Sequence, residues 1–167
     1  MANSFSYRYG PRDPRKFTVL SATVVEVGDM MYWLKDSDSN EVYPASSYTW
    51  DTNLATTQGT FAAVFVGIAM ESSASGDTDP ISIDVSPHSV YEFDVPSGTY
   101  YHGDEFGPDE GSSSLLDQTL EKVSASTSAI AKYAEKDASS QASTTKLRVT
   151  FAPAFTTASS NVNANIG

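Results

Sequence analysis

Cysteine is absent from this chain of 167 residues. The absence excludes disulfides, thiolate metal sites and Cys nucleophiles, and it permits folding in a reducing cytoplasm. Long apolar runs are also missing, because no stretch approaches the roughly 20 apolar residues that a membrane span needs, and residues 1–16 lack the apolar core of a signal peptide. We therefore expect a single soluble domain without a membrane partner.

Basic residues are scarce: ten Lys and Arg stand against 21 Asp and Glu, which gives a net charge of −11. Because affinity for phosphate backbones comes largely from Lys and Arg, nucleic acid is not an expected partner. Four of the basic residues fall within residues 1–16, where only Asp13 opposes them. This segment carries +3 and the rest of the chain −14, so we expect a basic N-terminal arm, a β domain over 17–152 and a C-terminal tail over 153–167.

β-branched and aromatic residues dominate the apolar segments, which predicts an all-β fold, a compact β-barrel or β-sandwich. The expected strands are FTVLSATVVEV (17–27), DMMYWL (29–34), TFAAVFVGIAM (60–70), ISIDV (81–85), SVYEFDV (89–95) and KLRVTF (146–151). Polar stretches such as DSDSN, SSASGDTDP and GPDEGSSS are expected to be loops. FAAVFVGIAM is nearly all apolar and should be buried on both faces.

The segment 115–137 has two interpretations. Leu116, Leu120 and Val123 fit a helical stripe, whereas SASTS (124–128) interrupts it with residues that prefer turns. A loose internal duplication favours strand and loop. The first copy has VGDMMYW followed by FVGIAMESS, and the second has HGDEFG followed by SAIAKYAEKD. Both copies place Gly-Asp before an apolar residue, and both end with a further strand. The second copy offers no glycine to match Gly67.

One of the two histidines, His102, lies among the carboxylates Asp104, Glu105, Asp109 and Glu110. A metal or acid/base site could use such a cluster, but the first copy carries Gly28-Asp29 without a histidine. We therefore expect glycine to supply an unusual φ and Asp to hydrogen-bond a turn. Asp36, Asp38 and Asn40 begin like a calcium loop, which Glu41 and Ser47 then interrupt. No catalytic residue, cofactor or metal is predicted, and the chain is not expected to be an enzyme.

The N-terminal arm is predicted to contact a partner protein. Phe5, Tyr7 and Tyr9 alternate with polar residues, so an extended arm would present an aromatic face and a basic one. Such an arm suits strand addition to a partner, and the alternative is that it packs on its own domain or on a sister subunit. The predicted contact residues are Phe5, Tyr7, Arg8, Tyr9, Arg12, Arg15 and Lys16.

The segments follow one another in a tandem order: a Gly-Asp strand, the apolar segment FVGIAMESSASGD, the strand ISIDV, then SVYEFDVPSGTYYHGDEFGP and a second round ending in KLRVTF. This order resembles that of the capsid decoration (cement) proteins of tailed bacteriophages. The resemblance spans about residues 24–151. It implies a non-enzymatic, β-rich virion protein that binds the outer surface of an icosahedral head through the major capsid protein, commonly as a homotrimer. It also implies synthesis in the host bacterial cytoplasm.

Two other classes of protein remain open at this point. A carbohydrate-binding or host-attachment module would use Tyr100, Tyr101 or Trp50 as stacking platforms for sugars. A metal-dependent hydrolase would use His102 with Asp104.

Overall fold

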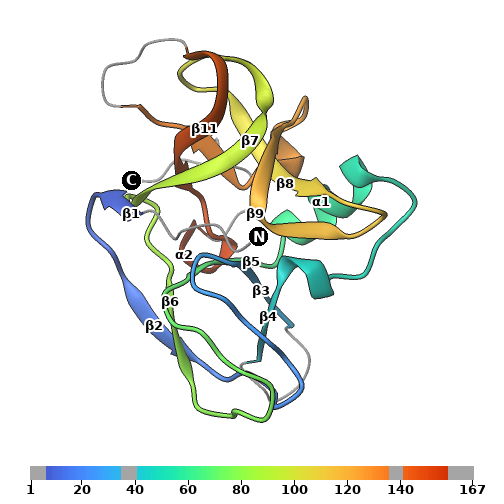
Figure 1. Cartoon of the computed structure of the whole chain (residues 1–167), viewed down its shortest axis with the longest axis vertical. Coiled ribbons are helices and arrows are strands. Elements are labelled where there is room, and N and C mark those ends of the chain that lie inside the picture. Colours follow the sequence, from blue (N-terminus) through green and yellow to red (C-terminus); the bar gives the residue numbers. More distant parts are fainter. Residues whose placement is uncertain (1–6, 35–40, 136–140, 158–167) are drawn as a thin grey trace.

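The computed structural model of the chain describes residues 7–34, 41–135 and 141–157. Within these ranges the fold is mostly strand, which confirms the predicted all-β class (Figure 1). The strands are β1 Tyr7–Tyr9, β2 Pro14–Phe17, β3 Met30–Trp33, β4 Val42–Pro44, β5 Phe65–Ala69, β6 Ile81–Asp84, β7 Val90–Tyr100, β8 Glu105–Glu110, β9 Leu115–Lys122, β10 Ala131–Tyr133 and β11 Gln141–Phe151. The helices are η1 Ala45–Ser47, α1 Leu54–Ala62, η2 Ser126–Ser128 and α2 Ala154–Thr157. No helix in the described part of the chain is long and apolar enough to cross a membrane.

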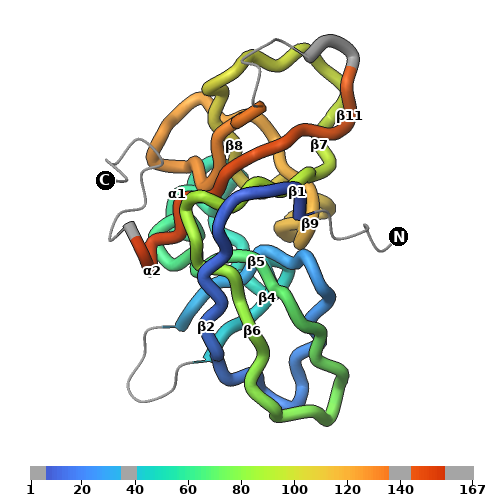
Figure 2. Tube along the Cα trace, turned by 90° about the vertical axis from the view of Figure 1, so that its left-hand side faces the viewer, coloured from blue at the N-terminus to red at the C-terminus, as the bar shows by residue number. Residues whose placement is uncertain are grey.

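The strands form two sheets, which occupy the lower and upper halves of the molecule in Figures 1 and 2. One sheet has the order β2-β6-β5-β3-β4, and we call residues 14–85 the N-terminal unit. The other has the order β1-β7-β11-β10-β8-β9, in which a parallel pairing of β7 with β9 closes five strands into a barrel. Residues 90–151 are the C-terminal unit, and β1 adds to its strand β7.

The two units have the same topology. Strands β2, β6, β5, β3 and β4 correspond in order to β7, β11, β10, β8 and β9, and the pairs of neighbours are antiparallel in both sheets. The closing contact is also repeated, because a parallel bridge joins Thr18 to Glu41 where the barrel pairs Asp94 with Thr119. The duplication predicted from the sequence is therefore present as two complete five-stranded units.

The register matches residue by residue. Phe17 pairs with Ile81 as Phe93 pairs with Leu147. Met31 pairs with Gly67 as Phe106 pairs with Ala131. Ala131 thus occupies the position of Gly67, for which the sequence offered no matching glycine. Gly67 has a φ of +152°, and a Cβ there would lie 2.0 Å from the Asp84 carbonyl oxygen, so only glycine fits this strand.

Ten equivalent positions are buried in both units. In the N-terminal unit these residues are Phe17, Val19, Val25, Met31, Val42, Val66, Ala69, Ile81, Ile83 and Val85. Their counterparts in the C-terminal unit are Phe93, Val95, Tyr100, Phe106, Leu120, Ile130, Tyr133, Leu147, Val149 and Phe151. The larger side chains of the second set give the C-terminal unit the bulkier core.

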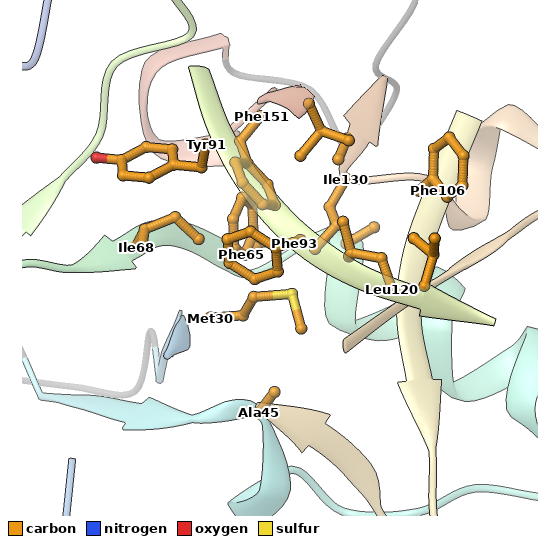
Figure 3. Close-up of a cluster of buried hydrophobic side chains, with 14 of the residues drawn as sticks. Met30, Ala45, Phe65, Ile68, Tyr91, Phe93, Phe106, Leu120, Ile130 and Phe151 are labelled. Carbon is orange, nitrogen blue, oxygen red and sulfur yellow. The ribbon is translucent and has the colours of Figure 1, made fainter. Parts of the chain in front are cut away.

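A second apolar face joins the units. Alternate residues of β3 and β5 point away from their own core and pack with the C-terminal unit: Met30, Tyr32, Phe65 and Ile68. The rings of Phe65 and Phe151 lie 5.6 Å apart, and Figure 3 places Met30, Phe65 and Ile68 below Phe151. This outer face explains why the segment 65–69 is buried on both sides, as its uninterrupted apolar sequence predicted.

The strand expected over 60–70 is only partly correct. Residues 60–62 belong to helix α1, and the strand covers 65–69. The Asn53 side chain caps the helix by accepting from the Thr56 amide at 3.0 Å. Helix α1 contains three threonines and Gly59, which are poor helix formers. Packing of the buried Phe61 against Tyr32 and Tyr48 therefore stabilises the helix.

Two further predictions are corrected and one is confirmed. The strand expected over 17–27 ends at Phe17, because residues 18–27 form a loop held by single bridges at Thr18 and Val25. Residues 107–110, expected in a loop, continue β8 in spite of Pro108. The segment 115–137 is strand and loop as favoured, with β9, η2 and β10 over its described part. Residues 36–40 lie outside the described residues.

Structural elements lie at both expected domain boundaries. The boundary between 16 and 17 falls inside β2, the counterpart of β7, so residues 14–16 belong to the N-terminal unit. At the other end, α2 returns to that unit, where Phe155 contacts Phe17 and Trp33 at ring distances of 5.5 and 5.9 Å. Residues 153–157 are therefore packed on the domain.

Candidate functional site

The Gly-Asp motifs are two copies of one turn. Gly28 and Gly103 have φ values of +100° and +90°, which favour glycine. Asp29 Oδ2 accepts from the Glu26 amide at 2.8 Å, and Asp104 Oδ2 accepts from the Tyr101 amide at 2.9 Å. Each turn is also tied to the strand beside it, since Gly28 N donates to Ala69 O and Gly103 N donates to Tyr133 O. The interpretation of Gly-Asp as turn chemistry is confirmed.

The carboxylates around His102 are occupied by local contacts. Asp104 uses its other oxygen, Oδ1, for an ion pair with Lys122 Nζ at 2.8 Å. Asp109 Oδ1 accepts from the Glu110 amide, and Glu110 Oε2 accepts from the Ser113 amide. The His102 ring lies 6.0 Å from the Tyr133 ring. Over residues 7–34, 41–135 and 141–157, no group of three or more His, Asp or Glu side chains is arranged to hold a metal ion.

The aromatic residues of the predicted arm lie on the C-terminal unit. Strand β1 pairs with β7, and the Tyr7 ring meets the Tyr91 ring edge-on at 5.8 Å. The Arg12 guanidinium lies 4.5 Å above the Tyr7 ring, which is a cation–π contact. Tyr9 OH donates to Ala134 O at 3.2 Å, and Phe5 lies outside the described residues.

The other basic residues of this segment form ion pairs. Arg8 Nη2 lies 2.7 Å from Glu92 Oε1, Arg15 Nε lies 3.0 Å from Asp13 Oδ1, and Lys16 Nζ lies 2.6 Å from Glu71 Oε2. The Lys16 contact lowers the pKa of the Glu71 carboxyl. The side chains of Arg15 and Lys16 nevertheless remain 58% and 59% exposed, so they are still accessible to a partner.

A buried carboxylate, Asp84, ties the two units together, and nothing in the sequence reasoning had selected it. Its side chain is 2% exposed, and Oδ1 accepts from the Asp13 amide at 2.9 Å and from the Ser86 amide at 3.0 Å. Oδ2 accepts from Ser89 Oγ at 2.6 Å and from the Tyr91 hydroxyl. Burial and the hydrogen bond to Asp84 raise the pKa of the Tyr91 phenol, so it stays a donor. The sequence signal for a buried carboxylate was an Asp inside the predicted strand ISIDV.

A pocket of about 400 Å³ lies where the loop 24–29 of the N-terminal unit faces β9 of the C-terminal unit. Three carboxylates line it, Glu26, Asp29 and Asp117, together with Gln118. Burial raises the pKa of Asp29 to about 6, although hydrogen bonds from Gln118 and from the Glu26 amide lower it. Burial likewise raises the pKa of Asp117, whose Oδ1 accepts from the Ser46 amide at 2.6 Å.

The aromatic residues proposed as sugar platforms are dispersed. Tyr100 is buried in the core and Trp50 packs against it, whereas Tyr101 is 60% exposed. Of the three, Tyr101 alone offers most of its ring to solvent.

Comparison with known proteins assigns no family to this chain. No protein-family model matches it, and no curated protein has a significant match to it. The resemblance to capsid decoration proteins therefore rests on the tandem pattern of glycines and apolar runs in the sequence itself.

Proposed function

We propose that this chain is a capsid decoration protein of a tailed bacteriophage, a structural virion protein without enzymatic activity. It binds the outside of the icosahedral head as a homotrimer, with the major capsid protein as its partner, and it stabilises the capsid. The host bacterial cytoplasm is the place of synthesis.

One observation carries the proposal. The Gly-Asp turns and apolar runs on which the resemblance rests occupy equivalent positions in two successive five-stranded units, down to matching backbone hydrogen bonds. The pattern is therefore a structural repeat and not a coincidence of composition. The charge of −11 agrees with a place outside the head, away from packaged DNA.

In this proposal the contact surface is the exposed side of β1 and β2. Tyr9 of β1 is partly exposed, and Arg15 and Lys16 extend from β2, the next strand along the chain. Aromatic and Arg side chains on a surface are typical of binding hot spots. These residues are packed on the domain and do not form the extended arm expected from the sequence. A partner would therefore bind a preformed surface, which lowers the entropy cost of binding.

The test is a binding assay with DNA-filled heads that lack the protein. We expect a fixed, stoichiometric number of copies per head and slower release of DNA on heating. Tyr9→Ala with Arg15→Ala should weaken binding at least tenfold, while Tyr101→Ala with Lys146→Ala serves as the matched control, since Tyr101 and Lys146 are also exposed. Absence of saturable binding to heads would refute the proposed function, and equal binding by both variants would refute the proposed contact surface.

A carbohydrate-binding or host-attachment module is the second candidate, and the exposed Tyr101 ring is the observation in its favour. A glycan array with the intact protein tests it. Binding to a defined glycan that Tyr101→Ala abolishes would support this function in place of capsid binding.

A further inference from the structure

The polar seam between the units lies beside the outer face of β3 and β5. Gln118 of β9 donates to Asp29 Oδ1 at 2.8 Å and to Val27 O at 3.4 Å. The same strand reaches η1, where Asp117 accepts from the Ser46 amide at 2.6 Å. Strand β9 of the C-terminal unit is thus hydrogen-bonded to two separate segments of the N-terminal unit.

The charges at this seam are of one sign. Asp29 is 4% exposed and faces Glu26 of its own turn and Asp117 of β9, while Gln118 and the Ser46 amide are neutral. Among the described residues that line the pocket there is no Lys, Arg or His. Ionising all three carboxyls therefore places negative charge on both sides of the seam with no cation to offset it.

We propose that Asp29 is a proton-operated latch: docking of the C-terminal unit on the N-terminal unit takes up a proton at Asp29, so the seam is tighter at mildly acidic pH than at pH 7.5. A neutral Asp29 removes the like charge that faces Asp117. Its carbonyl oxygen still accepts from the Glu26 amide, and its hydroxyl donates to Gln118 once that amide turns its oxygen toward it. The turn therefore keeps its hydrogen bond in the protonated state, and Asp29 stays bonded to Gln118, whereas the longer bond from Gln118 to Val27 O is lost.

The direction of the pH effect follows from linkage. The pKa of Asp29 is about 6 in the folded chain against 3.8 for an unperturbed Asp, so the folded state binds the proton more tightly. The stabilisation is present at low pH and is lost as the pH rises through about 6. The difference corresponds to a change of up to about a hundredfold in the folding equilibrium between pH 4 and pH 7.5.

The duplication supplies a matched control. Asp104 makes the same turn in the C-terminal unit, but its second oxygen pairs with Lys122 of the same unit. Asp29→Asn mimics the protonated latch, because its amide oxygen accepts from Glu26 and its NH₂ donates to Gln118. Asp104→Asn makes the same chemical change and loses an ion pair.

The experiment is chemical unfolding of the intact chain, of Asp29→Asn and of Asp104→Asn from pH 4 to pH 8. We expect Asp29→Asn to match the parent near pH 4 and to exceed it increasingly above pH 6, up to about a hundredfold in the folding equilibrium. Asp104→Asn should gain nothing at pH 7.5. A parent-to-Asp29→Asn ratio that stays constant over this range would overturn the latch.

A second measurement covers the case in which Asp29→Asn does not fold. Carbon NMR of the parent protein, with the Asp side chains labelled, follows each carboxyl through its titration. We expect Asp29 to titrate near pH 6 and the amide signals of Ser46 and Gln118 to shift with it. An Asp29 midpoint at or below 4, or a midpoint near 6 with unmoved seam amides, would refute the proposal. Neither measurement uses capsids, so failure here leaves the proposed function untouched.

Discussion

The hydrogen bonds of Asp84 give the sharpest prediction of stability. Asp84→Ala removes the acceptor of the Asp13 and Ser86 amides, both of which lie at the junction of the units. Each buried amide left without an acceptor costs roughly 1–3 kcal/mol. The Ser89 hydroxyl has a substitute, since Pro11 O lies 3.0 Å from its Oγ. Removing a buried negative charge offsets part of the loss, so we expect Asp84→Ala to lower the free energy of unfolding by about 2–5 kcal/mol.

Asp84→Asn separates hydrogen bonding from charge. Its Oδ1 still accepts from both amides, and its NH₂ can donate to the oxygens of Ser89 and Tyr91, whose hydroxyl hydrogens then turn elsewhere. We expect a loss of about 1 kcal/mol. Thr150→Ala is the control, because Thr150 occupies the position of Asp84 in the C-terminal unit and is only half-buried.

The assay is urea unfolding at pH 7, followed by circular dichroism and by fluorescence of the tryptophans. The expected order of stability is Asp84→Asn above Asp84→Ala, by about 1–4 kcal/mol. Equal stability of Asp84→Ala and Asp84→Asn would mean that the charge, and not the four hydrogen bonds, determines the contribution of this residue. An Asp84→Ala protein as stable as the parent would refute the assigned role altogether.

Three further predictions concern strand β5 and the two ends of the described chain. Gly67→Ala should prevent folding, because its Cβ would collide with the Asp84 carbonyl, whereas Ala131→Gly at the equivalent position should cost only about 1 kcal/mol; a soluble, folded Gly67→Ala protein by circular dichroism would contradict this. Phe155→Ala should uncover Trp33 and shift tryptophan emission to longer wavelength, with Tyr101→Ala as a control that leaves the emission unchanged. Deleting residues 2–16 removes β1 and most of β2, so we expect loss of the cooperative unfolding transition, and a transition like that of the full chain would place β2 outside the stable fold.

The parts of the fold that the sequence predicted are those set by local pattern. ISIDV and VYEFDV alternate apolar and polar residues, and both contain strands; the faces are as expected except at Asp84, which is buried. The Gly-Asp turns could be predicted because each needs a positive φ and a short-range hydrogen bond, and adjacent residues supply both. The duplication followed from the recurrence of those turns.

The parts that were missed depend on distant contacts. Three of the four residues of β2 are exposed, so no alternation distinguishes this strand from an arm. Helix α1 has weak intrinsic propensity and is held by packing across the molecule. The contact of Gln118 with Asp29 joins residues 89 positions apart, and the sequence around either residue does not predict it.

The outer face of β3 and β5 has a counterpart in the second unit, and the comparison bears on self-association. Where the N-terminal unit has Met30 and Ile68, the C-terminal unit has Glu105 and Lys132, and Gly107 and Ala129 replace Tyr32 and Phe65. The two units contact each other through different surfaces, a heterologous arrangement that continues into a filament when every unit carries both surfaces. Because the second copy has charged and small side chains at these positions, it does not offer a further unit the apolar face that β3 and β5 present to the C-terminal unit.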